Sequence, residues 1–302
     1  MVDESLIEYL KAKTNIEDEK LRRLLSYSDG PELTDEEKSK ITKAVDSLKV
    51  IDPAVGSGAF PMGVLHKLVH VLNKIDPNNT LWYELQYQKA LREVEEILKI
   101  RDKTEREELL RELNENFDDS INYPDYARKL YLIENSIYGV DIQSIAVQIC
   151  KLRFFLSLII DQKVSSEKDN YGIRALPHLE TKFVSANALI GIEKPKQLAF
   201  EDPKIKALKK ELKELYNKHF KVKTRSEKKE INKKAVEIRN KLKELLINDG
   251  WPNNTASKIA NFDIFDQTAT ADWFDPEWMF GVEDGFDIVI GNPPYVRQER
   301  IK

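Results

Sequence analysis

The chain has 302 residues, more than one compact domain usually needs, so we expect one large domain with insertions or two domains. Its formal net charge of −4 does not by itself favour a nucleic-acid ligand, and its one cysteine, Cys150, excludes a disulfide framework and a cysteine-based zinc site. Because no segment has the pattern of a secretory signal or a membrane span, we expect a cytoplasmic protein without membrane contact.

The first predicted elements are a helix, a strand and a second helix. Residues 34–48 begin with Thr34 and Glu37 in the spacing of a capping box, which predicts a helix start. Residues 49–52 form a short apolar segment that favours a strand. The helix that follows has one apolar face, formed by Val64, Leu65, Leu68, Leu72 and Ile75.

Three further strands are predicted at residues 136–140, 182–184 and 286–290, each followed by a polar or glycine-rich turn. Residues 145–160 are apolar on all sides, as expected of a helix buried against a sheet. The alternation of strands and helices predicts an α/β fold with a parallel, doubly wound sheet. Ligands of such sheets bind beyond the carboxyl ends of the strands.

Residues 76–130 and 193–260 are too long for simple crossovers, and we expect both to be helical insertions. Within the second insertion, residues 203–246 carry 16 Lys and Arg against 6 Glu, a local charge of +10 that leaves −14 for the rest of the chain. Apolar residues at spacings of three and four predict a helical hairpin that turns near residues 224–226. Its charges could solvate a protruding coiled coil, the explanation we favour, or contact DNA phosphates.

The loop at residues 52–60, Asp-Pro-Ala-Val-Gly-Ser-Gly-Ala-Phe, lies between the first strand and a helix. Gly56 and Gly58 allow the backbone to approach a ligand closely, and a helix start offers free N–H groups. The loop lacks the lysine of a phosphate-binding P-loop and the third glycine of a dinucleotide-binding motif. It therefore predicts a cradle for another polar cofactor, with a plain strand-to-helix turn as the alternative.

Asp141 ends the second predicted strand. A carboxylate at this position can accept hydrogen bonds from both hydroxyls of a ribose. It can equally cap the helix that begins near Ser144, and the sequence does not decide between these roles.

Asn292-Pro293-Pro294-Tyr295 follows the fourth predicted strand. Two prolines fix the backbone, so the Asn292 side chain and a neighbouring carbonyl become a rigid pair of acceptors. Such a pair suits the two hydrogens of a planar amino group, whose nitrogen becomes more nucleophilic, while Tyr295 can stack on the ring that bears it. The alternative is a strand-ending turn without chemistry.

Two other groups favour ordinary structural roles. His66 and His70 have the spacing of metal ligands on a helix, but no third ligand is placed beside them, so we interpret them as part of a helix face and predict no metal site. Trp273, Trp278 and Phe280 are interpreted as packing residues.

Together these stretches resemble the gamma-class adenine-N6 DNA methyltransferases, and in particular the methyltransferase regions of type IIG restriction-modification enzymes. Four segments are similar to that family's motifs I to IV, in the same order: residues 52–60, 138–142, 185–189 and 292–295. Residues 274–280, shortly before the fourth strand, are also similar to the approach to motif IV in that subfamily.

The resemblance implies an S-adenosylmethionine cofactor and double-stranded DNA whose target adenine is flipped out of the helix. The implied cofactor-binding residues are Asp52, Pro53, Ala54, Gly56, Gly58, Phe60, Asp141, Ile142, Asn187 and Ala188. Among them, Asp52, the two glycines and Phe60 would line the methionine end, Asp141 would hold the ribose, and Asn187 would lie near the adenine of the cofactor. The implied catalytic residues are Asn292, Pro293, Pro294 and Tyr295.

The implied fold is the Rossmann-like parallel sheet of a class I S-adenosylmethionine-dependent methyltransferase, with strand order 3-2-1-4 and long helical insertions. We expect residues 1–192 to form the first part of the cofactor-binding core, residues 193–260 the basic hairpin, and residues 261–302 the catalytic strand and motif. We also expect the chain to be a fragment that ends soon after this motif, with any endonuclease domain outside it.

Two alternatives stay open. A methyltransferase for the side-chain amide of a protein glutamine uses the same Asn-Pro-Pro-Tyr chemistry, because a planar amide nitrogen poses the same problem. The chain could also be a non-catalytic DNA-binding scaffold that uses its basic hairpin.

Overall fold

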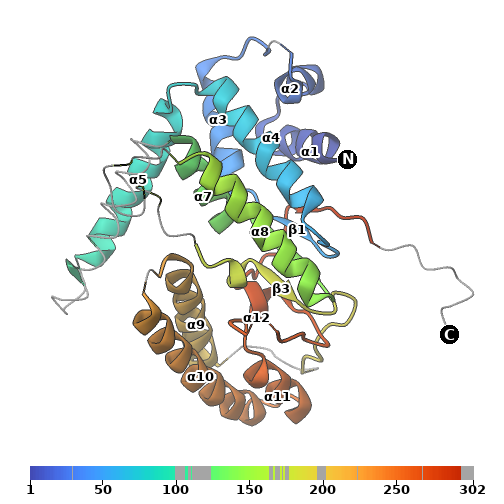
Figure 1. Ribbon diagram of the computed structural model, residues 1–302, viewed down its shortest axis with the longest axis vertical. Coiled ribbons are helices and arrows are strands. Elements are labelled where there is room, and N and C mark those ends of the chain that lie inside the picture. Colours follow the sequence, from blue (N-terminus) through green and yellow to red (C-terminus); the bar gives the residue numbers. More distant parts are fainter. Residues whose placement is uncertain are drawn as a thin grey trace, which may run out of the picture. The chain divides into compact units, whose positions relative to one another are not determined.

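The computed structural model describes residues 1–28, 30–98, 106–107, 110, 124–162, 166, 171, 173, 177–195, 202–222, 224–266 and 268–293 (Figure 1). The chain divides into two compact units, which we describe separately. Unit 1 comprises Met1–Val50, Met62–Ile137 and Leu156–Ile173, and unit 2 comprises Ile51–Pro61, Tyr138–Phe155 and Arg174–Lys302.

Unit 1 is helical. Its elements are α1 (Val2–Thr14), α2 (Asp18–Leu25), α3 (Asp35–Ser47), most of α4 (Ala59–Ile75), α5 (Thr80–Ile97) and α7 (Pro124–Asn135). The predicted capping box at the start of α3 is confirmed, because Thr34 and Glu37 exchange side-chain to backbone hydrogen bonds of 2.8 and 3.2 Å. The predicted apolar face of α4 is confirmed as well: Val64, Leu65, Leu68, Leu72 and Ile75 are all buried.

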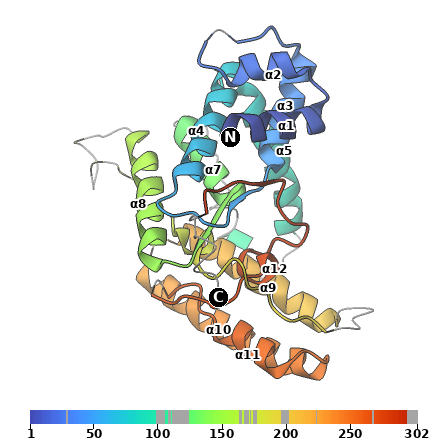
Figure 2. The same ribbon diagram turned by 90° about the vertical axis from the view of Figure 1, so that its right-hand side faces the viewer.

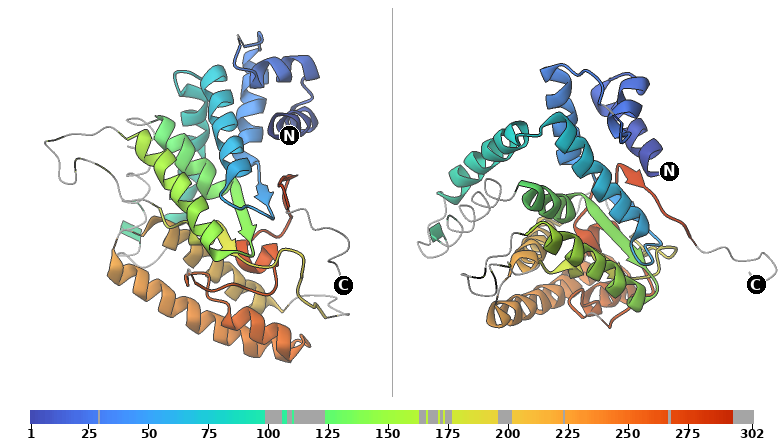
Figure 3. Two further views of the ribbon diagram at one scale, coloured as in Figure 1. Left: turned by 45° about the vertical axis from the view of Figure 1, so that its right-hand side comes forward. Right: turned by 45° about the horizontal axis from the view of Figure 1, so that its top comes forward.

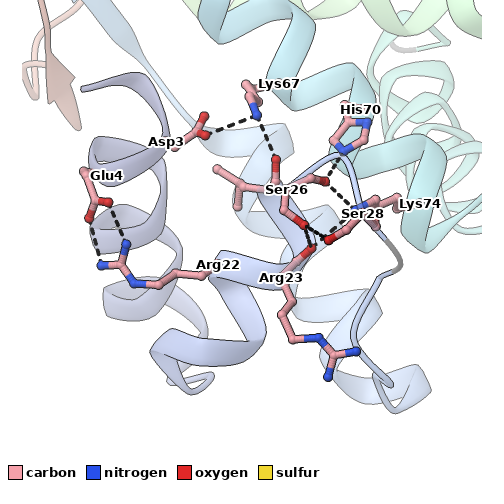
Figure 4. Close-up of polar contacts among 10 residues, drawn as sticks. Asp3, Glu4, Arg22, Arg23, Ser26, Ser28, Lys67, His70 and Lys74 are labelled. Atoms are coloured by element: carbon pink, nitrogen blue, oxygen red, sulfur yellow. Dashed lines mark hydrogen bonds and ion pairs between the residues drawn. The ribbon is translucent and has the colours of Figure 1, made fainter.

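Basic side chains of α4 bind the carboxyl end of α2 (Figure 4). Lys67 Nζ donates to the Leu25 carbonyl at 2.8 Å, and Lys74 Nζ donates to the Ser26 carbonyl at 2.5 Å. His70 Nε2 lies 2.8 Å from the same Ser26 carbonyl. Positive charge at a helix carboxyl end is favourable because the helix dipole is negative there. His70 therefore has a local structural contact, and the described residues contain no group of three metal-binding side chains.

A buried ion pair joins the two ends of the first predicted insertion. Asp76 accepts backbone hydrogen bonds from Thr80 and Trp82 at the start of α5, and its carboxylate lies 2.9 Å from Arg128 of α7. Both charged side chains are at most 2% exposed. Helices at both ends of this insertion agree with the prediction, whereas residues 111–123 lie outside the described part of the chain.

The central sheet contains β1 (Val50–Asp52), β2 (Ile137–Asp141), β3 (Phe183–Ser185) and β4 (Ile288–Val289), all predicted from the sequence (Figure 3). The strand order is β3-β2-β1-β4, as expected. β2 and β3 pair in parallel, with Gly139 opposite Phe183 and Asp141 opposite Ser185. The α/β prediction is therefore confirmed, and the carboxyl ends of β2 and β3 meet at one edge of the sheet.

Helix α8 (Ser144–Ile160) is buried on one side only. Cys150, Phe154 and Leu158 are fully buried, but the opposite side of the helix exposes large apolar side chains by 46 to 80%. These are Ile145, Ile149, Leu152, Leu156 and Ile160. The prediction of a helix buried against the sheet is confirmed for one side, where the Phe154 ring centroid lies 4.7 Å from that of Phe183 in β3. A helix on a sheet buries only the side that faces it.

The basic segment forms the predicted hairpin, α9 (Pro203–Lys221) and α10 (Arg225–Asn248), followed by α11 (Asn253–Asn261) (Figure 2). Thr224 and Glu227 form a capping box at the turn. The favoured interpretation as a protruding coiled coil was wrong, because the apolar stripes of both helices belong to the same buried cluster as the sheet. That cluster includes Leu212, Tyr216, Ile231, Ile238 and Leu242 of the hairpin together with Ile51, Val140 and Val184 of the strands.

The remaining predictions about packing hold. Trp273 and the two aromatic residues of α12 (Pro276–Phe280), Trp278 and Phe280, are buried in this cluster, as interpreted from the sequence. In the part of the chain that the structure describes, no helix is long and apolar enough to cross a lipid bilayer.

A substitution of Leu242 tests whether the hairpin belongs to the core. Because this side chain is fully buried, we expect Leu242→Ala to lower the free energy of unfolding by about 2–5 kcal/mol. It should also speed amide hydrogen exchange in β3. Ile247→Ala, at a position 39% exposed, is the matched control and should cost well under half as much. Unchanged exchange in β3 would show that the hairpin unfolds independently of the sheet.

Candidate functional site

The Asp52 carboxylate lies buried at the carboxyl end of β1, with 1% of the residue exposed. Its Oδ1 accepts a hydrogen bond of 3.0 Å from the Ala54 N–H. Burial raises the pKa of Asp52 to about 6; the bond from Ala54 opposes this shift and the nearby charge of Asp141 adds to it. Asp52 is thus a desolvated acid at the edge where α/β sheets bind ligands.

The end of β4 lies directly against Asp52. Ile290 N–H donates to the Ile51 carbonyl at 3.0 Å, and a Cβ on Gly291 would lie only 2.6 Å from Asp52 Oδ1. The segment that leads into Asn292 therefore reaches the loop after β1. Asn292 and Pro293 are exposed, while Pro294 and Tyr295 lie outside the described residues.

Asp141 joins the loop after β1 to the end of β2. Its Oδ2 accepts from the Gly56 N–H at 2.8 Å, and its Oδ1 accepts from the Gln143 N–H at 2.9 Å. The second bond forms the turn before α8, so Asp141 shapes the approach to this helix. The first bond brings two predicted site residues into direct contact although they are 85 positions apart.

Gly58 has no room for a side chain. Its φ is +82°, and a Cβ would lie 2.6 Å from the Sγ atom of Cys150 in α8. Cys150 is fully buried, and burial raises the pKa of its thiol to about 12, so it stays protonated at neutral pH. Cys150 is therefore a core residue. Gly56, by contrast, has φ +51°, and the nearest atom to a Cβ there would be the Ala54 carbonyl oxygen at 4.0 Å, an ordinary contact.

The segment after β3 holds Asn187 in a local turn. Asn187 Oδ1 accepts from the Leu189 N–H at 3.1 Å, and its own N–H donates to the Ala271 carbonyl at 3.0 Å. The preceding N–H, that of Ala186, donates to the Asp141 carbonyl at 2.9 Å. The backbone before Asn187 is therefore bonded to the end of β2.

The other predicted residues lie on the same segments and are more exposed than Asp52. Pro53, Ala54 and Phe60 are half-buried in the β1 loop and the start of α4, Ala188 is half-buried, and Ile142 is 59% exposed. Direct contacts thus link Asp52 with Ala54 and Gly56 with Asp141.

Sequence reasoning missed two contacts of this site. Gly291 precedes the predicted motif but was not assigned a role, and only its position at a strand end could have signalled a close approach. Arg153 of α8 donates from Nη1 to the Ser57 carbonyl at 3.0 Å and lies 3.3 Å from the Ser57 hydroxyl. No local pattern could have found this pair, because 96 positions separate the two residues.

The two loop glycines yield a matched pair of substitutions. Gly56→Ala should cost about 1 kcal/mol of unfolding free energy, because only its positive φ is strained. Gly58→Ala should cost about 1–3 kcal/mol more, because its Cβ also meets Cys150. Chemical denaturation measures both values, and Cys150→Ala should restore part of the Gly58→Ala loss. Equal costs at the two positions would contradict the close approach.

Comparison with known proteins supports the family. Residues 135–302 match the Eco57I restriction-modification methylase family, a region that includes Asp141, Asn187 and Asn292 but begins after the β1 loop. Over 147 residues the chain is 32% identical to a Methanocaldococcus jannaschii protein provisionally named a type II restriction enzyme and methyltransferase. This match covers 49% of the chain but 9% of that protein. No solved structure gives a significant match. Since more than half of its residues match, the chain belongs to the Eco57I restriction-modification methylase family.

Proposed function

We propose that the chain is the cofactor-binding and catalytic part of an S-adenosylmethionine-dependent methyltransferase that methylates N6 of adenine in DNA, within a type IIG restriction-modification enzyme. The observation that carries this proposal is the close approach of Gly291 to Asp52. It brings the segment before Asn292 to the loop that begins at Asp52, so cofactor and target groups would share one edge of the sheet. Family membership and the strand order of a class I methyltransferase support the same assignment.

The residues of the β1 edge fit such a cofactor. Gly56 and Gly58 present backbone without side chains, and the buried Asp52 carboxylate is suited to the cationic methionine end. Asp141 would hold the ribose hydroxyls, and Asn187 would lie beside the adenine. When bound, S-adenosylmethionine supplies a methyl group on a sulfonium, an electrophile that a neutral amino nitrogen can attack.

We propose that Asn292 and Pro293 orient the target amino group. The side-chain oxygen of Asn292 and the carbonyl of Pro293 would each accept one hydrogen of that group, which leaves the nitrogen lone pair available. Tyr295 would stack on the adenine after it leaves the duplex. No nucleophilic cysteine is required, which agrees with the buried, protonated thiol of Cys150.

The hairpin is proposed to contact DNA phosphates from its solvent side. Its apolar stripes are buried, so most of its basic residues point away from the core; exposed examples are Lys206, Lys210, Lys229, Lys233 and Lys241. Some of the basic side chains are paired, since Lys209 binds Glu277 and Lys234 binds Glu230. Contacts of this kind would add salt-dependent affinity without reading the base sequence.

Removal of the Asn292 side chain tests the catalytic assignment. In the full-length protein, Asn292→Ala should lower methyl transfer to unmethylated DNA by about 100- to 1,000-fold, because one acceptor of the target amino group is lost. The affinity for S-adenosylhomocysteine should stay within about twofold, since Asn292 is not proposed to touch the cofactor. Transfer of a labelled methyl group and calorimetric titration measure the two quantities.

Asn253→Ala, at an exposed position of α11, serves as the matched control and should change neither quantity. Methyl transfer to protein glutamine but not to DNA would favour the amide methyltransferase instead. DNA binding without cofactor binding would favour the scaffold.

The raised pKa of Asp52 predicts a pH dependence. Because its pKa is about 6 rather than the ordinary 3.8, the folded protein holds a proton that the unfolded chain releases, so the free energy of unfolding should fall as pH rises from about 4 to 6. If the ionised carboxylate binds the ammonium group of the amino-acid end, the dissociation constant for S-adenosylhomocysteine should rise about tenfold per pH unit below about 6.

Asp52→Asn should remove the pH dependence of both the free energy of unfolding and the dissociation constant for S-adenosylhomocysteine. It should also weaken the binding of this ligand at pH 7. Urea denaturation and calorimetry across pH 4.5–7.5 measure them. Binding that stays constant between pH 5 and 7 in the unmodified protein would contradict the role of Asp52.

A further inference from the structure

We infer that Arg153 is a positioning residue that orders the β1 loop for cofactor binding, an inference that rests on the proposed function. Its guanidinium reaches across from α8 to Ser57, the residue between the two loop glycines. The Nη1 atom donates to the Ser57 carbonyl at 3.0 Å and approaches the Ser57 hydroxyl at 3.3 Å. A single arginine atom thus engages both the main chain and the side chain of the loop tip.

The three residues at the loop tip, Gly56, Ser57 and Gly58, each have a separate contact with another element; we call these contacts the anchors of the loop. Gly56 donates to the Asp141 carboxylate at the end of β2, Ser57 accepts from Arg153, and the Cα of Gly58 lies against Cys150. Gly58 N–H also donates to the Val55 carbonyl at 2.8 Å, which closes the turn. Of these anchors, the one to Ser57 is the most exposed, because both Ser57 and Arg153 lie at the surface.

Helix α8 supplies two of the three anchors. Cys150 and Arg153 are three positions apart, so they lie on neighbouring parts of the same helix face. Cys150 fixes how closely the loop approaches the helix, and Arg153 fixes the direction of the Ser57 peptide. The two contacts have different effects. The buried contact between Gly58 and Cys150 contributes to the stability of the fold, whereas the exposed hydrogen bond from Arg153 adds little to global stability.

An ordered loop lowers the entropy that cofactor binding must otherwise remove. Arg153 contacts Ser57, which is not among the residues proposed to carry the reaction. Its loss should therefore weaken cofactor binding and leave the chemical step of the bound enzyme unchanged. Arg153 belongs to none of the four motif segments and makes its contact only through the folded structure.

Substitution of Arg153 tests this inference with two readouts. In the protein without cofactor, Arg153→Gln should speed amide hydrogen exchange at residues 55–58 by about tenfold, the effect of losing one charged hydrogen bond. The dissociation constant for S-adenosylhomocysteine and the KM for S-adenosylmethionine should rise by a similar factor, with kcat unchanged. Arg153→Lys keeps a charged donor and should recover part of both effects. Lys43→Gln, an exposed cation of α3, should alter neither.

The outcomes separate the inference from the function on which it rests. If the unmodified protein binds S-adenosylhomocysteine but Arg153→Gln binds it equally well, or shows unchanged exchange at residues 55–58, the role of Arg153 is refuted and the proposed function stands. A fall in kcat with unchanged KM would also refute it, because Arg153 would then act on the chemical step. Failure of the unmodified protein to bind cofactor would refute both.

Discussion

The buried carboxylate of Asp52 is the constraint on which the candidate site depends. Removing a carboxylate from water is unfavourable, and among the described residues only the Ala54 N–H donates to it, so its pKa rises to about 6. The same oxygen lies against Gly291, where no Cβ fits. The ends of β1 and β4 therefore approach each other so closely that only a glycine fits at position 291 beside the Asp52 carboxylate. A buried ionisable group with a raised pKa at the carboxyl edge of an α/β sheet is typical of a functional site.

Two helical layers support this edge in different ways. Helix α8 carries Cys150 under Gly58 and Arg153 beside Ser57, so the loop rests on a rigid element instead of on other loops. The hairpin buries its apolar stripes in the cluster that contains Ile51 and Val140. Its local charge of +10 is therefore a property of the solvent side of a core element and does not mark a separate body.

Local patterns predicted much of the fold. The four strands, the capping box at Thr34 and the hairpin follow from short-range periodicity and turn chemistry, whereas the strand order was implied by the resemblance to a methyltransferase family. The exposed side of α8 could not be predicted, because apolar residues such as Ile149 and Leu152 do not reveal which side has a neighbour. The contacts of Gly291 with Asp52 and of Arg153 with Ser57 join distant positions and arise only once the sheet has formed. The sequence thus predicted the strands and the turns that follow them, whereas the contacts between distant segments could be found only in the structure.

The central claim is that the carboxyl edge around Asp52 binds S-adenosylmethionine. A crystal structure of the protein with S-adenosylhomocysteine tests it most directly. We predict the methionine end of the ligand at the loop of Asp52, Gly56 and Gly58, and its ribose at the Asp141 carboxylate. A ligand bound elsewhere, or bound without contact to either carboxylate, would contradict the assignment of this edge as the cofactor site.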